Sequence, residues 1–309
     1  MQKHNVEHGL DFSNVNTIAL GITELNTELE INFNKNIFCT PSGIAMFSSL
    51  ANYKKDLLVF NYTDIKFIRY LLRNNFFLNL NIEIEEDFRR HDATANMLEC
   101  TTIKQDGDPD LIDSKLEKIL TSHIHGKKNL VLGVLLTTYE IVDNILEHSM
   151  GDDFVISNRS LDIPGYVSAQ YYTKNNIVEI GISDMGKGIV DTMSSESEYL
   201  LLDRKDILFK AFELNTTRHK KIMPTRGNGL AKLKEFVLAS NGSIRCRTNE
   251  FIIFFNNDFP EGRIQSVQPV QGTHFEIKIG CKCDIDTKPI FNTDISDYED
   301  NDELEDFFD

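Results

Sequence analysis

The chain has no tryptophan, few cysteines and no long apolar run. Its five cysteines are odd in number and lack the paired spacing of a disulfide framework, which favours a reducing compartment. They are Cys39, Cys100, Cys246, Cys281 and Cys283. The most apolar stretch, Leu130 to Leu136, is far shorter than the ~20 residues that a membrane-spanning helix needs. We therefore expect a soluble, cytoplasmic protein.

Basic residues are also scarce, with 32 Lys and Arg against 48 Asp and Glu and a formal net charge of −16. Residues 284–309 contain eleven acids against Lys288 alone and contribute −10, so the remaining body carries only −6. Such a body has no broad basic face to neutralise phosphates, and an acidic tail repels DNA and anionic membranes. We expect neither nucleic acid nor a membrane as a partner.

The 309 residues exceed the length at which a single core usually keeps growing, and 21 of them are phenylalanine. We expect a small α/β domain over 1–126, a second domain over 127–283 and a disordered acidic tail over 284–309. In the first domain, residues 28–33 and 56–61 read as strands, each followed by a helical pattern, near 42–54 and 63–75. The tail has too little apolar surface to fold alone.

The second domain begins with a helix from Asn129 to Ser149, predicted by a broad apolar stripe. Two strands then flank Lys174-Asn175-Asn176, a composition that suits a hairpin turn. A helix opening at Gly227 and strands near 243–248, 250–256 and 273–281 follow. The pattern predicts an α+β sandwich, with helices on one face of an antiparallel or mixed sheet.

Three polar residues recur every four positions on the long helix: Glu140, Asn144 and His148. This spacing places a carboxylate, an amide and an imidazole on one face, one turn apart. Such a line at the edge of a buried helix is an unusual choice for solvation alone. Taken by itself, however, it is also compatible with an ordinary solvated helix face.

A second motif, Asp184-Met185-Gly186-Lys187-Gly188, directly follows an apolar strand. Its glycines allow the backbone to approach a ligand closely, and an aspartate there can accept a hydrogen bond from an exocyclic amine. A turn that simply ends a strand has the same composition.

A third motif, Arg226-Gly227-Asn228-Gly229-Leu230, opens a predicted helix. Amides at a helix start bind anions, and Arg226 with the upstream Arg218 could add contacts to phosphate oxygens. The alternative is a loop with a flexible helix start. A fourth, weaker signal is Gly272-Thr273, which precedes the last predicted strand.

In order and spacing, these four motifs resemble the gyrase, heat-shock chaperone, histidine kinase and mismatch-repair (GHKL) ATPase superfamily over about half of the chain. The resemblance implies a site for ATP and Mg²⁺, with Asn144 as the metal ligand and Glu140 as the candidate general base. It assigns Asp184 to the adenine amine and makes residues 189–226 a mobile lid. The implied nucleotide-binding residues are Asn144, His148, Asp184, Gly186, Gly188, Arg218, Arg226, Gly227, Asn228, Gly229, Leu230 and Thr273.

One position departs from the histidine kinase pattern, because Glu147 stands where those enzymes usually carry a basic residue. The series Glu140, Asn144 and His148 is instead similar to the motif of anti-sigma serine kinases. No phospho-acceptor motif of the H-E-x-x-x-P kind precedes the domain, which argues against a complete sensor histidine kinase.

The segment around Ser42, between a predicted strand and a predicted helix, weakly resembles the STAS domains of anti-sigma-factor antagonists. In that family a serine at the matching place accepts phosphate from a GHKL serine kinase. The alternative interpretation is that Ser42 only caps the helix.

These patterns favour an ATP-binding signalling protein that hydrolyses ATP or phosphorylates a protein hydroxyl. The alternative is a non-catalytic ATP sensor whose nucleotide state controls partner binding. Either function implies a protein partner or a homodimer.

Overall fold

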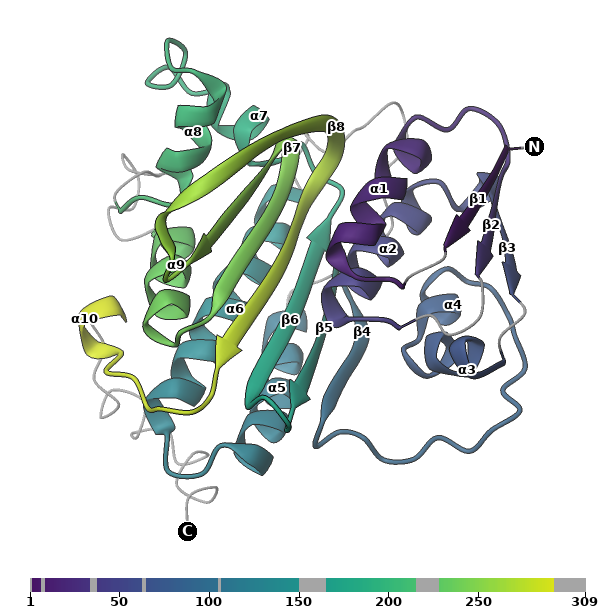
Figure 1. The fold of residues 1–309 in the computed structure, drawn as a ribbon, viewed down its shortest axis with the longest axis horizontal. Helices are drawn as coiled ribbons and strands as arrows, with labels where there is room; N and C mark the ends of the chain where they lie inside the picture. The colour runs from purple at the N-terminus through teal and green to yellow at the C-terminus, as the bar shows by residue number, and fades with distance from the viewer. Residues whose placement is uncertain are drawn as a thin grey trace.

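The computed structural model describes residues 2–6, 9–33, 38–62, 65–104, 107–149, 165–214 and 228–291. They form an α+β protein with a small parallel sheet and a larger antiparallel sheet. Helices lie between the two sheets and against the far face of the larger one (Figure 1).

The N-terminal unit alternates strands and helices. Its three strands pair in the order β1-β2-β3, all parallel, as expected when helical crossovers join them. The expected strands and helices are present, with ends within two residues of the predicted ones. Their bounds are β1 Gln2–Val6, α1 Phe12–Thr23, β2 Leu29–Phe33, α2 Pro41–Tyr53, the 3₁₀ turn η1 Lys55–Leu57, β3 Leu58–Tyr62, α3 Ile65–Arg73 and α4 Phe76–Asn79.

The larger sheet has the strand order β4-β5-β6-β8-β7, and every neighbouring pair is antiparallel. Of the two arrangements that we expected, antiparallel or mixed, the structure has the antiparallel one. The strands are β4 Met97–Ile103, β5 Gly165–Tyr172, β6 Ile177–Asp184, β7 Ser243–Asn256 and β8 Phe259–Gly280. The helices that accompany them are α5 Asp108–His123, α6 Lys128–Ser149, α7 Ile189–Ser194, α8 Arg204–Ala211, α9 Gly229–Ala239 and α10 Lys288–Phe291.

The boundary that we expected near residue 126 is displaced, because β4 and α5 belong to the larger unit. Strand β4 is the edge strand beside β5, and α5 packs beside α6 in the same core. The sequence analysis did not predict β4. This strand follows a long stretch after α4 that contains no helix or strand before residue 97. The larger unit therefore begins near Met97.

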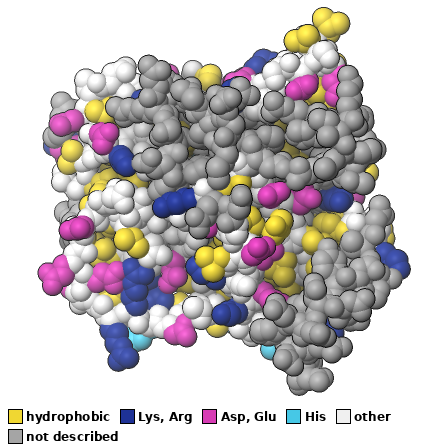
Figure 2. Space-filling view, turned by 180° about the vertical axis from the view of Figure 1, so that it is seen from behind, with side chains coloured by type: hydrophobic (Ala, Val, Ile, Leu, Met, Phe, Trp, Pro, Cys, Tyr) yellow, Lys and Arg dark blue, Asp and Glu magenta, His cyan; other side chains and the backbone are white. Residues whose placement is uncertain are grey.

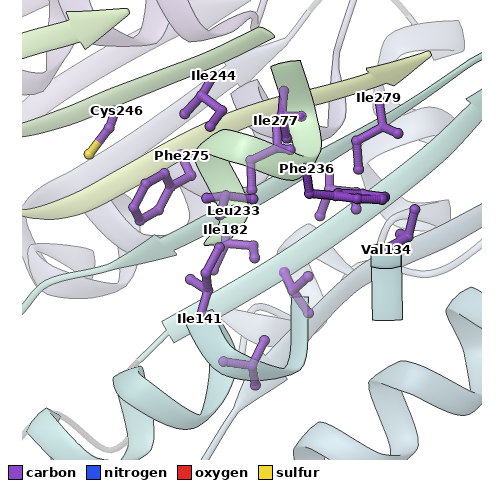
Figure 3. Close-up of a cluster of buried hydrophobic side chains, with 14 of the residues drawn as sticks. Val134, Ile141, Ile182, Leu233, Phe236, Ile244, Cys246, Phe275, Ile277 and Ile279 are labelled. Carbon is purple, nitrogen blue, oxygen red and sulfur yellow. The ribbon is translucent and has the colours of Figure 1, made fainter. Parts of the chain in front are cut away.

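Apolar residues on one face of the larger sheet pack against α5, α6 and α9. Figure 3 shows this cluster, in which Ile277 of the sheet lies beside Phe236 of α9, and Ile182 and Phe275 lie beside Leu233 of the same helix. A methyl group on Gly133 would lie 2.1 Å from the Phe236 ring, so α6 and α9 approach too closely there for a larger residue.

Helix α6 is long and apolar enough by composition to cross a membrane between Lys128 and Leu146, yet 56% of that span is buried inside the protein. Its apolar stripe is covered by the sheet, α5 and α9. This is the environment of a core helix in a soluble protein.

Helices α1 and α2 cover the opposite face of the larger sheet (Figure 1). Helices therefore cover both faces, where we expected one. Helix α2 is buried along nearly its whole length, and Gly181 of β6 provides the room for it. A methyl group on Gly181 would lie 2.3 Å from the Ser42 Cα atom.

Residues 284–291, which we assigned to the acidic tail, pack against the larger unit instead. The Asp284 carboxylate accepts a hydrogen bond from the Leu130 backbone N–H at 3.1 Å, at the start of α6. The Phe291 ring lies 6.0 Å from that of Phe236. The rest of the predicted tail, 292–309, lies outside the described residues.

Candidate functional site

The polar edge of α6 lies against the first residue of α9. A methyl group on Gly229 would come within 2.6 Å of the Glu140 Oε2 atom, so the exposed Glu140 carboxylate reaches the start of that helix. Asn144 follows one turn later and is half-buried. The side chain of His148 lies outside the described residues.

The same stretch of α6 approaches the end of β6 where Asp184 stands. Ile145, next to Asn144, would lie 3.0 Å from a methyl group on Gly165, and Gly165 pairs directly with Asp184. The α6 motif and the Asp184 motif therefore meet at one end of the larger sheet, although 40 residues separate Asn144 from Asp184 in the chain.

Asp184 is the last residue of β6, and two backbone amides orient its carboxylate. Oδ1 accepts hydrogen bonds from the Gly186 N–H at 2.7 Å and the Thr273 N–H at 3.2 Å. Burial raises the pKa of Asp184 to about 6, although both bonds act in the opposite direction. Among the described residues none bonds to Oδ2, so this carboxylate can accept a hydrogen bond from a ligand amine.

Gly272 brings Thr273 to Asp184. Its φ of 89° is in the left-handed region, and a methyl group there would lie 2.0 Å from the Asp184 carbonyl oxygen. Only glycine combines this conformation with so close a contact. The weak Gly272-Thr273 signal thus corresponds to a close contact with the Asp184 motif.

The glycine loop after Asp184 is held by residues that we did not single out from the sequence. Asn249 donates from Nδ2 to the Lys187 carbonyl at 2.8 Å and accepts from the Val190 N–H at 3.1 Å. The Thr248 hydroxyl accepts from the Ile189 N–H at 2.9 Å. Gln271 donates to the carbonyls of Met185 and Gly186. These residues were missed because Thr248 only ends an expected strand, and Asn249 and Gln271 lie between or before the expected strands, where polar residues are common.

At the third motif, Asn228, Gly229 and Leu230 stand at the start of α9, and Gly229 is buried against Glu140. Arg218, Arg226 and Gly227 lie outside the described residues. The described residues of the motifs thus meet in two contacts, Glu140 with Gly229 and Asp184 with Thr273. The close approach of Ile145 on α6 to Gly165, which pairs with Asp184, links these two contacts.

The first part of the predicted lid is packed rather than loose. Within 189–214, helices α7 and α8 bury Val190, Ile207 and Phe212 in the main core, and the Phe212 ring lies 4.8 Å from that of Phe255. Arg204 on α8 pairs with Asp191 at 2.7 Å. The first part of the expected lid of 189–226 is therefore part of the packed core, and its remaining part, 215–226, lies outside the described residues.

Ser42 is neither the helix cap nor an accessible hydroxyl. The cap of α2 is Thr40, whose hydroxyl accepts from the Gly43 N–H at 3.1 Å. Ser42 is 1% exposed, and its hydroxyl donates to Glu179 Oε1 at 2.8 Å and to Glu276 Oε2 at 3.4 Å. In this arrangement no kinase reaches it, and a phosphate would stand beside two carboxylates.

Within the described ranges, no cluster of three or more His, Cys, Asp or Glu forms a metal site. Magnesium does not need one, because it is usually bound through one or two protein oxygens together with phosphates and water. The half-buried amide of Asn144, one turn from the exposed Glu140, fits such a sparse donor set.

The sequence matches no protein-family model, and no curated protein matches it significantly.

Proposed function

We propose that the unit spanning residues 97–291 is a magnesium-dependent ATP-binding domain of the GHKL type, with the Bergerat arrangement of the nucleotide site. The observation that carries the proposal is Asp184, a half-buried residue at a strand end whose carboxylate Oδ1 is oriented by Gly186 and Thr273. That geometry suits an acceptor for the exocyclic amine at C6 of adenine, where guanine instead carries a carbonyl oxygen that would repel a carboxylate.

The approach of Glu140 to Gly229 supports the phosphate end of the proposed site. The amides at the start of α9 provide positive potential for phosphate oxygens. Asn144, one turn along α6, would hold Mg²⁺ through its amide oxygen, and the ion would neutralise charge on the phosphates. Arg218, Arg226 and Gly227 would add contacts from the segment that completes the lid, and His148 would contribute from the next turn.

In the catalytic form of the proposal, Glu140 orients the attacking water or protein hydroxyl and accepts its proton. The exposed carboxylate lies where α6 and α9 meet, beside the helix start that would receive the phosphates. Gly186 and Gly188 would admit the nucleotide, because larger residues would crowd it.

The second candidate is an ATP sensor without turnover, which the packing of Glu140 also favours. Since its carboxylate lies against Gly229, Glu140 could shape the pocket rather than activate a nucleophile. Glu140→Gln separates the two functions. Lost turnover with retained ATP binding supports catalysis, whereas the absence of turnover in the wild type supports the sensor.

We further propose that the protein acts in the cytoplasm with a protein partner or a second copy of itself. All five cysteines are free, and four are buried, which suits a reducing compartment.

Calorimetric titration with ATP and Mg²⁺ tests the proposal. Asp184→Asn should weaken binding by at least about 10-fold, because an amide in that place presents a donor where the adenine amine needs an acceptor. Asn144→Ala should abolish the dependence of binding on Mg²⁺. Binding that is unchanged in both variants, or absent from the wild type, would refute the proposal.

A further inference from the structure

Arg247 on β7 is a buried guanidinium bonded to neutral groups. It is 1% exposed, and its Nε donates to Asn16 Oδ1 on α1 at 2.7 Å. Its other nitrogens donate to the carbonyls of Asn249, Phe251 and Gln268. Burial lowers the pKa of Arg247 to about 10. None of these partners in the described part of the chain is a carboxylate, and a buried cation of this kind is costly unless its hydrogen bonds are satisfied.

The contacts of Arg247 fix the backbone around Asn249. The β7–β8 register shifts on both sides of this residue, and its φ of 49° is left-handed. Asparagine tolerates that conformation better than most residues. The arrangement directs the Asn249 amide at Lys187 and Val190, so one side chain holds both ends of the turn that contains Gly188.

Gly188 is fitted to this amide. Its φ is 85°, and a methyl group there would lie 2.4 Å from the Asn249 Oδ1 atom. The shape of the glycine loop therefore depends on Asn249, and the place of Asn249 depends on Arg247.

A second connection reaches the same loop from α2. The Ser49 hydroxyl donates to the Ser183 carbonyl at 3.1 Å, immediately before Asp184. The N-terminal unit thus contacts the proposed site twice, through Asn16 by way of Arg247 and Asn249, and through Ser49.

We propose that Asn249 and Arg247 are positioning residues that fix the glycine loop for the nucleotide, and that they couple nucleotide binding to the docking of α1 on the larger sheet. This inference rests on the proposed function. Since coupling between two binding events is reciprocal, a bound nucleotide strengthens the docking as much as the docking strengthens nucleotide binding. The N-terminal unit then acts as the regulator of the site.

Asn249→Gly removes the amide and keeps the left-handed backbone accessible. Its matched control is Asn241→Gly, because Asn241 is also left-handed, with a φ of 54°, and lies beyond the opposite end of α9. Asn16→Ala tests the link to α1, with Asn14→Ala on the same helix as its control, since the Asn14 amide bonds only to Asp11 among the described residues.

Two readouts are needed, amide hydrogen exchange of residues 185–190 without nucleotide and calorimetry with ATP and Mg²⁺. We expect about 10-fold faster exchange and about 10- to 100-fold weaker binding for Asn249→Gly, and about 5-fold weaker binding for Asn16→Ala. Both control variants should match the wild type in both readouts.

Unchanged exchange and affinity in Asn249→Gly would overturn the inference, as would equal losses in the controls. If Asn249→Gly does not fold, Asn16→Ala decides by the same readouts, and unchanged affinity there overturns the coupling. A wild type that binds no ATP refutes the proposed function and the coupling, whereas the exchange measurement still decides whether Asn249 fixes the loop.

Discussion

The two faces of the larger sheet are both buried but are built from different chemistry. Toward α6 and α9, β6 and β8 present Ile180, Ile182 and Ile277. Toward α1 and α2, the same strands present Glu179 and Glu276 among other polar groups. One face is held by apolar packing, which is insensitive to direction, and the other by hydrogen bonds and ion pairs that work in one geometry only.

The polar face is a connected network. Glu276 receives bonds from Arg245 at 2.7 Å and from Lys278 at 2.9 Å, and Arg245 also donates to Ser13 on α1 at 2.8 Å. His274 bonds to the Ser183 hydroxyl at 2.6 Å, and burial lowers its pKa to about 3. Such networks give less net stability than apolar packing but specify a single docked arrangement.

Ser42→Asp should break the polar face most severely. It places a third carboxylate beside Glu179 and Glu276, and an uncompensated buried charge costs about 3–5 kcal/mol. Denaturant unfolding measures the loss. Ser42→Ala is the control and should cost only about 1 kcal/mol, the value of one hydrogen bond. Equal stability of the two variants would show that Ser42 is not docked against these carboxylates.

Ile180→Ala should damage the apolar face through a cavity. Ile180 is 1% exposed, and such a truncation costs about 2–5 kcal/mol. Val59→Ala on β3, where the side chain is 39% exposed, should change the unfolding free energy by less than about 0.5 kcal/mol. A loss below about 1 kcal/mol for Ile180→Ala would contradict the apolar packing described for this face.

Gly181→Ala tests how closely the N-terminal unit is docked. The added methyl group would meet the Ser42 backbone, and overpacking costs about 1–3 kcal/mol. Gly21→Ala on α1 has no atom within 4 Å of the new group and should stabilise by about 0.5–1 kcal/mol. The thermal unfolding temperatures of the two variants should therefore shift in opposite directions. A shift in the same direction would argue against the close contact between Gly181 and α2.

The smallest of these expected effects is a pH dependence of stability that Glu179 gives to the polar face. Burial raises the pKa of Glu179 above its ordinary value of 4.5 in the folded protein. The folded state therefore binds the proton more tightly, so stability should fall as pH rises from 4.5 through the folded pKa. Glu179→Gln should reduce this decline in unfolding curves measured at successive pH values, and Asp184, whose pKa is also raised, should account for part of what remains. If Glu179→Gln keeps the full decline in stability, a titratable group other than Glu179 causes it.

Sequence patterns predicted well the elements whose apolar residues have one clear period. The hairpin turn at Lys174-Asn175-Asn176 is an example, because its polar run separates two strand patterns and Asn176 adopts a left-handed φ of 52°. The α2 helix and the β6 strand were found for the same reason.

What the sequence could not show is where polar residues end up. Glu179 and Glu276 alternate with apolar neighbours, as in a solvated sheet face, yet α2 buries them. A period of two reports which residues share a face and not what covers that face. The displaced domain boundary follows from the same limit, since nothing local distinguishes a strand of one sheet from a strand of another.

The local geometry of the candidate site was predictable where motifs are contiguous, and its support from distant residues was missed. Asp184 and its glycines form one short motif, whereas Asn249 acts on that motif from 62 residues beyond Lys187. Its role depends on a register shift in β7 that no propensity predicts.

The central claim is that α6, the loop after β6 and the start of α9 surround one nucleotide. Hydrogen exchange during a titration with ATP and Mg²⁺ tests it directly, with peptides covering 140–147, 184–190 and 228–232. The account predicts that all three segments gain protection with the same midpoint and that GTP protects none of them at equal concentration. Protection of only one segment, or different midpoints for the three, would contradict it.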